Sequence, residues 1–240
     1  NFQGAGTIAA FIMEPVLGAG GVIPPHASFM PAVREVCDRH GILLIADEVI
    51  TGFGRTGAWS GSRLWGVQPD VMCIAKAITS GYFPLGAALI NERIATAFES
   101  DSSGKAAIGH GYTYSGHPVG AAAALAAIAE TRRLDVVTNA AARGTQLYDG
   151  MVSLAGQYPV VGDVRGGHGL MTAMELVADR ETKAPIDGKL TISMQKAAYE
   201  AGALIRVSGP NVILSPSLVI EEADIDIALN AVEAGLKAIC

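Results

Sequence analysis

Two short runs of apolar residues, each followed by a polar side chain, stand out in the hydrophobic pattern of the chain. Residues 42–46 read Ile-Leu-Leu-Ile-Ala and precede Asp47, and residues 71–75 read Val-Met-Cys-Ile-Ala and precede Lys76. Continuous apolar runs of about five residues are typical of strands that are buried on both faces of a parallel sheet. The pattern therefore predicts two such strands, with Asp47 and Lys76 at their carboxyl ends.

Further segments repeat the alternation of strand and helix around these two runs. Ser28 can cap a helix that Gly41 ends, and Asn91 can cap a second helix farther along the chain. In chain order, the pattern predicts a buried strand at about 7–13, a helix at 28–40, a strand at 86–90 and a helix at about 92–98. Repeated strand–helix–strand units imply right-handed crossovers. The predicted fold class is therefore α/β, with a mainly parallel sheet flanked by helices.

The second half of the chain has a different pattern. Residues 100–116 are polar and glycine-rich and predict a loop, and Pro118 suits the first turn of an alanine-rich helix that reaches about Arg133. Further helix is expected at about 135–155. Short alternating segments follow at 170–177, 203–207 and 212–214. Two longer helical segments lie at 190–201 and 222–238. Such a mixture is typical of a smaller α+β domain.

These elements predict a chain in three parts. Residues 1–134 form the large domain, 135–156 a connecting helix, and 157–240 the small C-terminal domain. The chain does not begin with Met, and the strand at 7–13 has no earlier strand to start a sheet. We therefore expect residues 1–134 to be the C-terminal portion of a larger domain whose N-terminal part is missing.

Composition narrows the class of protein. Half of the 240 residues are hydrophobic and only 17% are charged, which allows extensive burial, including a subunit interface. The net charge of −6 and the lack of a basic stripe argue against a nucleic-acid partner. No apolar run approaches the roughly 18 residues of a membrane span. The cysteines, Cys37, Cys73 and Cys240, have neither paired nor metal-like spacing, so we expect thiols in a reducing cytoplasm and no metal site.

Asp47 and Lys76 are expected at one edge of the sheet, because the ligand crevice of an open α/β sheet lies outside the carboxyl ends of its strands. Taken singly, Asp47 could cap the next turn and Lys76 could be a solvated loop residue. As a pair they are harder to explain in this way, because a lysine at a buried edge is costly unless it is used. A pyridoxal-phosphate enzyme needs an amine that forms a Schiff base and a carboxylate that keeps the pyridine nitrogen protonated.

Three stretches around these residues resemble a known family. They are LIADEVITGFGRTG at 44–57, Pro-Asp at 69–70 and Ala-Lys-Ala at 75–77. Together they are similar to the signature of the class III, or ω-, aminotransferases, which are pyridoxal-phosphate-dependent enzymes of fold type I. With the motifs described below, the resemblance covers essentially the whole chain, and it implies pyridoxal 5'-phosphate as the cofactor.

The resemblance also implies roles for three residues. In that family the aspartate of the Asp-Glu pair binds the pyridine nitrogen, which gives this role to Asp47. The hydrophobic residue two places later packs against the ring face, and here it is Val49. The family's lysine forms the Schiff base and moves the proton between the substrate Cα and the cofactor C4′. That catalytic role falls on Lys76.

Residues 112–118, Tyr-Thr-Tyr-Ser-Gly-His-Pro, precede a predicted helix N-terminus, where free N–H groups and the helix dipole favour an anion. An ordinary capped helix entry would explain the segment equally well. In similar enzymes the threonine at this place reaches across a dimer interface to the cofactor phosphate of the partner subunit. The resemblance therefore implies that Thr113 binds phosphate in a homodimer with shared active sites.

Two further residues are candidates for binding substrate. Arg206 is expected at the end of the strand at 203–207, where it could also be an ordinary structural arginine. In ω-aminotransferases an arginine placed this way forms a bidentate pair with the substrate carboxylate and swings away for apolar amines. Glu14 follows the first predicted strand, before the glycines at 18–21, and could position substrate or simply support the loop. The glycine spacing is not that of a dinucleotide-binding fingerprint.

Two departures from the family pattern refine the reading. Ornithine-type members usually carry glutamine directly after the ring-packing residue, where this chain has Ile50. This difference favours amine or β-amino-acid:pyruvate aminotransferases. In addition, the family's Gly-Ser/Thr phosphate loop and the aromatic residue that stacks on the pyridine are not present in this chain.

The sequence therefore predicts an aminotransferase that moves an amino group from an amine or ω-amino acid to a keto acid such as pyruvate, with its N-terminal part missing. Two alternatives stay open. One is a class III aminomutase or decarboxylating aminotransferase, which shares these residues and differs in its substrate contacts. The other is a catalytically inactive fragment that keeps the fold.

Overall fold

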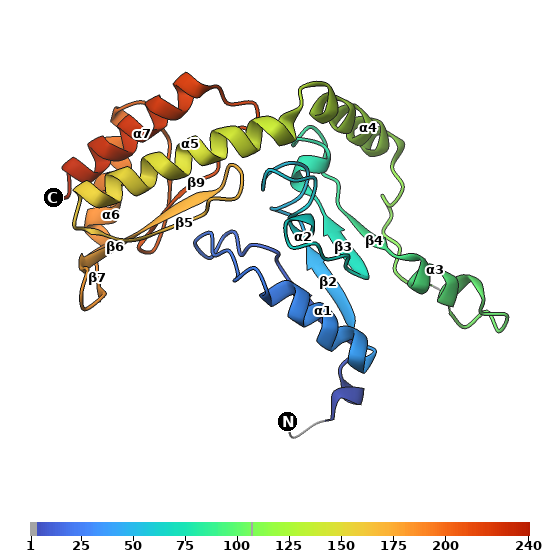
Figure 1. The fold of residues 1–240 in the computed structure, drawn as a ribbon. Coiled ribbons are helices and arrows are strands. Elements are labelled where there is room, and N and C mark those ends of the chain that lie inside the picture. The colour runs from blue at the N-terminus through green and yellow to red at the C-terminus, as the bar shows by residue number, and fades with distance from the viewer. Residues whose placement is uncertain (1–3, 107) are drawn as a thin grey trace. The chain divides into compact units, whose positions relative to one another are not determined.

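The computed structural model describes residues 4–106 and 108–240 (Figure 1). The chain forms two compact units. The first holds the residues up to Pro15 together with Pro25–Phe53 and Ser60–Arg133, and the second holds Val16–Pro24, Gly54–Trp59 and Leu134–Cys240. The second unit thus takes two loops from the first half of the chain. The division into domains at residues 134 and 156 stays a prediction.

The first unit contains a four-stranded sheet in the order β1-β2-β3-β4. Its strands are β1 (Ala10–Met13), β2 (Leu43–Asp47), β3 (Val71–Ile74) and β4 (Ala87–Ile90). The first three are parallel, as predicted from the apolar runs, whereas β4 is antiparallel to β3. The link between β3 and β4 contains the short 3₁₀ helix η2 (Lys76–Ile78) but no crossover helix, so the chain reverses direction there. The expectation that the strand at 86–90 continues the parallel sheet was wrong.

The strand β1 also differs from the expectation, because it is exposed. Phe11 and Ile12 are 41% and 61% exposed. The strand lies at the edge of the sheet and, among the described strands, pairs only with β2, so one of its edges has no neighbouring strand there. An apolar run therefore predicted the strand correctly but not its burial.

The longer helices of the first unit lie where the sequence predicted them, whereas the short helix at 61–64 was not predicted. These helices are α1 (Phe29–His40), α2 (Gly61–Leu64), α3 (Glu92–Glu99) and α4 (Pro118–Arg133). Gly41 ends α1 in the left-handed conformation, and the Asn91 side chain accepts a hydrogen bond from Ile94 N at 3.1 Å. The predicted cap at Ser28 was wrong: its hydroxyl bonds to His26 Nδ1 and makes no cap bond.

Two apolar clusters hold this sheet. In the first, Met30 and Cys37 of α1 pack with Leu44 and Ala46 of β2, which alternate with less buried neighbours. Figure 1 shows α1 alongside β2. In the second, Ile74 and Ile78 flank Lys76 in the sequence and pack with Ala124 of α4. The backbone on both sides of Lys76 is therefore fixed by buried side chains.

The second unit is an antiparallel sheet covered by helices. Its strands are β5 (Val161–Arg165), β6 (Thr172–Asp179), β7 (Ala184–Pro185), β8 (Arg206–Ser208) and β9 (Asn211–Leu214), in the order β5-β6-β9-β8 with β7 beside β6. Its helices are α5 (Val136–Gln157), α6 (Gly188–Glu200) and α7 (Glu222–Lys237). Leu147, Met174, Met194 and Ile225, from α5, β6, α6 and α7, are fully buried in one core. This arrangement confirms the α+β character predicted for the C-terminal part.

No helix in the described residues combines the length and the apolar character that a membrane span requires.

Candidate active site

Three of the predicted site residues meet at the carboxyl edge of the parallel strands. Glu14 directly follows β1, Asp47 is the last residue of β2, and Lys76 comes two residues after the end of β3. The register aligns these strand ends, because Met13 is opposite Ala46 and Asp47 is opposite Cys73. The structure therefore brings Glu14, Asp47 and Lys76 to one edge of one sheet, as the sequence predicted.

Asp47 presents an unshared carboxylate oxygen at this edge. The side chain is half-buried, and its Oδ1 accepts a hydrogen bond from Val49 N at 3.1 Å. The other oxygen, Oδ2, accepts no hydrogen bond from residues 4–106 or 108–240. Burial and then the negative charge of Asp47 raise the pKa of the Cys73 thiol, which places the carboxylate beside β3. Asp47 is thus a charged acceptor with one oxygen available to a ligand.

Lys76 has a backbone conformation that is uncommon for its residue type. Its φ is +46°, in the left-handed region, which costs an L-residue roughly 1–2 kcal/mol. Such conformations persist only where the surroundings impose them, and they cluster at functional sites. The Lys76 side chain is exposed, and its ammonium makes no ion pair with the described residues. The backbone at Lys76 is therefore held in a defined conformation, and its amine has no protein partner among the described residues.

Val49 and Thr113 lie in turns of the first unit. Val49 is half-buried two residues beyond Asp47. Thr113 is exposed in a turn closed by a hydrogen bond from Ser115 N to Tyr112 O at 3.0 Å. A second turn, closed from His117 N to Tyr114 O at 3.2 Å, connects it to α4. The predicted position of Thr113 at the entry to a helix is therefore correct.

Arg206 lies in the second unit, and its position in the strand differs from the expectation. It is exposed and begins β8 rather than ending a strand at 203–207. The reason is the pairing with β9, which starts at Arg206 opposite Ile213. The apolar residues before it, Leu204 and Ile205, precede the strand.

Glu48 is an essential part of the site's framework that the sequence did not reveal. Its side chain is 1% exposed, and its carboxylate accepts hydrogen bonds from Gly61 N and Ser62 N, each at 2.7 Å, and from Thr51 Oγ1. These contacts fasten the segment after Asp47 to the start of α2. The one available signal was the second carboxylate directly beside Asp47.

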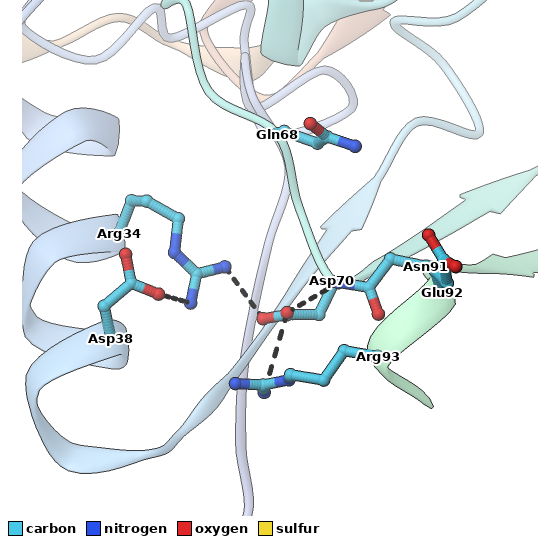
Figure 2. A pocket seen from close by; sticks show the side chains of 7 residues that line it. All are labelled: Arg34, Asp38, Gln68, Asp70, Asn91, Glu92 and Arg93. Atoms are coloured by element: carbon cyan, nitrogen blue, oxygen red, sulfur yellow. Dashed lines mark hydrogen bonds and ion pairs between the residues drawn. The ribbon is translucent and has the colours of Figure 1, made fainter. Parts of the chain in front are cut away.

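Asp70 organises the opposite end of β3 (Figure 2). It accepts hydrogen bonds from Leu44 N and Arg34 Nη1 at 2.8 Å and from Asn91 Nδ2 at 2.9 Å. It borders a polar cavity of about 370 Å³ that Arg93 also lines. Because Asp70 precedes the first residue of β3, this cavity lies at the end of the strand away from Lys76. We interpret the cluster as structural support for α1, β2 and α3.

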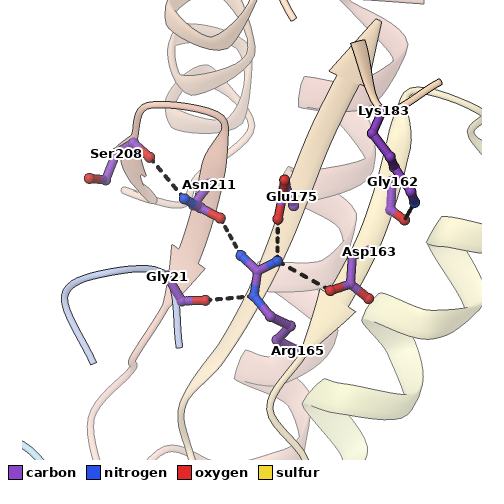
Figure 3. A network of polar contacts seen from close by, with 8 residues as sticks. All are labelled: Gly21, Gly162, Asp163, Arg165, Glu175, Lys183, Ser208 and Asn211. Carbon is purple, nitrogen blue, oxygen red and sulfur yellow. Dashed lines mark hydrogen bonds and ion pairs between the residues drawn. The ribbon is translucent and has the colours of Figure 1, made fainter. Parts of the chain in front are cut away.

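A second polar network, centred on Arg165, lies in the second unit (Figure 3). Arg165 donates to Gly21 O at 3.0 Å, pairs with Asp163 at 3.2 Å, and also contacts Glu175 and Asn211. These bonds tie the loop Val16–Pro24 to β5, β6 and β9. The network therefore fixes the loop that begins two residues after Glu14.

In the described part of the chain, no group of three or more His, Cys, Asp or Glu side chains could hold a metal ion.

Comparison with known proteins gives a consistent family. Residues 3–236 match the family model described as aminotransferase class-III. The chain is 41% identical over 240 residues to an uncharacterized aminotransferase of Sinorhizobium fredii, covering 98% of this chain and 51% of that protein. It is 39% identical over 224 residues to the putrescine–pyruvate aminotransferase of Pseudomonas aeruginosa, covering 93% of this chain and 48% of that protein.

Solved structures give the same result for the fold. The crystal structure of an amine transaminase from an uncultivated Pseudomonas species, in its PLP-bound form, matches with a TM-score of 0.95 and 51% sequence identity. The match covers 99% of this chain and 54% of that one. The chain thus spans about half the length of the relatives it matches. The predicted fold, that of the fold type I transaminases, is confirmed for this chain.

Proposed function

The chain belongs to the class III aminotransferase family, and from this premise we propose that it is part of a pyridoxal-phosphate-dependent aminotransferase. The reaction moves an amino group from an amine or ω-amino acid to a keto acid such as pyruvate. The observation that carries the proposal is the placement of Asp47 and Lys76 at one edge of adjacent parallel strands. It joins a carboxylate with an available oxygen to an amine without an ion-pair partner in the described residues.

The spacing of these two groups suits pyridoxal phosphate. Asp47 lies opposite Cys73, and the three residues from Cys73 to Lys76 span at most roughly 10 Å of chain. A pyridine ring and an extended lysine side chain can bridge such a gap. When bound, the cofactor supplies an aldehyde that accepts amines and a ring that withdraws electrons. The residues present therefore fit this cofactor.

Each proposed residue does a separate job. Asp47 Oδ2 accepts the N–H of the protonated pyridine nitrogen, and Val49 packs against the ring. Lys76 Nζ would hold the aldehyde carbon of the bound cofactor as a Schiff base, formed with loss of water. Once the substrate amine displaces it, the freed Lys76 amine would accept the proton from the substrate Cα and deliver it to C4′. The left-handed backbone at Lys76 sets the direction in which that side chain leaves the chain.

The remaining proposals concern partners and location. Thr113 binds the cofactor phosphate of a second copy, so the protein works as a homodimer with shared sites. Arg206 pairs with a substrate carboxylate, and Glu14 positions substrate at the edge that it shares with Asp47. A cytoplasmic location is supported by the three free cysteines, Cys37, Cys73 and Cys240.

The substrate class follows from two observations. Ile50 stands where ornithine-type members carry glutamine. The named relatives also include an amine transaminase and a putrescine–pyruvate aminotransferase. Both favour amines and ω-amino acids as donors, and the name of the Pseudomonas aeruginosa relative supports pyruvate as the acceptor.

Replacement of Lys76 tests the proposal in the protein made at its natural full length. Lys76→Ala should lower turnover with putrescine or β-alanine and pyruvate on the order of a thousandfold. Borohydride reduction of the cofactor-loaded protein should leave a mass adduct on the Lys76 peptide, and the variant should lack it. Normal turnover in Lys76→Ala would overturn the assignment.

The same preparation separates the alternatives. Carbon dioxide released in step with donor consumption would indicate a decarboxylating enzyme, and an isomerised amino acid formed without pyruvate would indicate an aminomutase. A full-length wild-type protein that takes up no cofactor would identify a scaffold that only keeps the fold.

A further inference from the structure

The loop that follows Lys76 is closed by a buried threonine. Thr79 is 1% exposed, and its Oγ1 donates a hydrogen bond to Phe83 O at 2.6 Å. Thr79 N also donates to Lys76 O at 3.4 Å. Ser80 and Gly81, with φ of 49° and 82°, make the reversal between them. Thr79 therefore links the backbone of Lys76 to that of Phe83.

The ring of Phe83 lies directly against the backbone of α4. A Cβ placed on Gly120 would come within 2.9 Å of Phe83 Cε1 and 3.0 Å of Cδ1. Real Cβ atoms essentially never approach this closely, so a Cβ at position 120 would force the ring of Phe83 or the helix to move. One helical turn later on the same face, Ala124 packs with Ile78, two residues after Lys76. The loop is thus seated on α4 at two points.

The same ring also contacts the residue that leads into α4. The ring centroids of Phe83 and His117 are 5.2 Å apart. His117 caps the helix, because its Nδ1 accepts from Val119 N at 3.2 Å and its carbonyl accepts from Ala121 N at 3.1 Å. It also closes the turn at 114–117, which connects the turn containing Thr113 to α4. One aromatic ring therefore touches both the helix and its entry segment.

We propose that Phe83 is a positioning residue that locks the loop carrying Lys76 onto α4 and onto the turn at 114–117, which connects Thr113 to α4. The inference rests on the proposed function, in which Lys76 binds the cofactor of its own subunit and Thr113 binds the cofactor phosphate of the second copy. Phe83 touches neither cofactor nor substrate in this proposal. It acts by fixing the separation of the two segments through Thr79 on one side and His117 on the other.

The sensitivity of the reaction to this separation has a geometric reason. A displacement of about 1 Å at a reacting group can lower a rate on the order of a hundredfold. Lys76 sits in a left-handed backbone conformation that the surrounding packing must impose. A shift of Phe83 away from Gly120 would release that constraint while leaving Asp47, on β2, in place.

A pair of complementary substitutions tests the contact in the full-length cofactor-loaded protein. Gly120→Ala inserts the clashing Cβ, and Phe83→Leu removes the two ring atoms that it would meet. We expect Gly120→Ala to slow the half-reaction with the best amine donor on the order of tenfold to a hundredfold. It should also move the pH midpoint of the bound cofactor's visible absorbance, which a loss of stability alone would not do. The double variant should regain most of the rate and the wild-type midpoint.

Gly156→Ala is the matched control, because a Cβ at this helical glycine meets no atom within 4 Å. It should keep the wild-type rate and midpoint. If Gly120→Ala does not fold, Phe83→Ala makes the same test without touching the helix and should show the same slowing and the same displaced midpoint.

Two outcomes would overturn the inference. The first is that Gly120→Ala folds but keeps the wild-type half-reaction rate and the wild-type pH midpoint of the absorbance. Where Gly120→Ala does not fold, the same result in Phe83→Ala would count equally. The second is a folded double variant that stays as slow as Gly120→Ala. Failure of the proposed function looks different, because the wild type itself would then show no absorbance that depends on Lys76.

Discussion

Asp47 and Cys73 stand directly opposite each other on the neighbouring parallel strands β2 and β3. Three residues after Cys73 the chain reaches Lys76, so a carboxylate and an amine meet at the edge where open α/β sheets bind ligands. The same register places the charge of Asp47 next to the Cys73 thiol and raises its pKa, after the larger effect of burial. The alignment of β2 and β3 therefore brings a carboxylate and an amine to one edge, and it also raises the pKa of a neighbouring thiol, which can be measured.

Asp47→Asn should slow amino transfer while leaving Lys76 able to bind the cofactor. The amide cannot hold the pyridine nitrogen in its protonated form, and loss of one such electrostatic contact typically costs on the order of a hundredfold in rate. Stopped-flow measurement of the half-reaction with an amine donor checks the loss. Borohydride reduction should still label the Lys76 peptide.

An independent readout of the same variant needs no cofactor. Removing the negative charge of Asp47 should lower the pKa of Cys73, although burial will keep it above its ordinary value. The pH dependence of alkylation, followed on the Cys73 peptide by mass spectrometry, should move to lower pH. An unmoved profile would contradict the electrostatic contact between the two residues.

Glu48→Gln should destabilise the first unit without altering its surface. Both carboxylate oxygens accept hydrogen bonds, from Gly61 N and Thr51 on one side and from Ser62 N on the other. The amide turns an NH₂ group towards a backbone N–H, which leaves buried polar groups unpaired and costs about 2–3 kcal/mol. Denaturant unfolding measures the loss. The exposed Glu99→Gln is the control and should leave the unfolding midpoint in place.

Asp70 should make stability depend on pH in the acid range. Burial alone would raise its pKa, but the hydrogen bonds from Leu44 N and Arg34 outweigh burial, so the pKa is lowered. A carboxyl with a depressed folded-state pKa adds stability that is complete above its unfolded value of about 3.9 and is lost as pH falls through the folded value. Asp70→Asn should therefore cost roughly 3 kcal/mol at neutral pH, and the difference from wild type should shrink below about pH 4.

The control for Asp70 is the other acidic partner of the same arginine. Asp38 pairs with Arg34 at 2.7 Å, but its side chain is 63% exposed. Asp38→Asn should cost less than about 1 kcal/mol, as exposed ion pairs do. Equal losses in the two variants, or a constant difference between Asp70→Asn and wild type from pH 7 to 3, would show that Asp70 does not act as described.

The sequence predicted the parts of the fold that depend on local signals. The apolar runs before Asp47 and Lys76 marked β2 and β3, Gly41 and Asn91 marked helix ends, and Pro118 marked the start of α4. The motif spacing was enough to place Asp47 and Lys76 at one edge, because strand ends and side-chain positions are tied together in a parallel sheet.

What the sequence did not predict depends on pairing between distant segments. The antiparallel direction of β4 depends on the missing crossover helix, and the exposure of β1 depends on its place at the edge of the sheet. β5, with Gly162 and Asp163 in its middle, is too polar to show an apolar run. The burial of Glu48 depends on N–H groups 13 and 14 residues away, which no local pattern reveals.

Arg206→Ala should separate donors that carry a carboxylate from those that do not. If Arg206 pairs with the substrate carboxylate, KM for β-alanine should rise by about tenfold or more, as loss of a charge-assisted bond of about 1.5–3 kcal/mol requires. KM for putrescine, which has no carboxylate, should stay unchanged. Steady-state kinetics with pyruvate held constant make the comparison, and a parallel rise for both donors would point to a structural role.

Two glycines of α5 should respond in opposite directions to the same substitution. A Cβ on Gly144 would lie 2.1 Å from Gly169 O and 2.3 Å from its carbonyl carbon, so the clash is with backbone rather than with a flexible side chain. Gly169 cannot retreat, because its own Cα is packed against Arg55 O, which would lie 2.3 Å from a Cβ there. Gly144→Ala should therefore cost about 3 kcal/mol or more of unfolding free energy.

Gly156→Ala, in open space on the same helix, should be neutral or stabilise by up to about 1 kcal/mol through helix propensity. Thermal unfolding of the two variants side by side checks the pair, and similar midpoints would mean that α5 does not pack on Gly169 as closely as the structure places it.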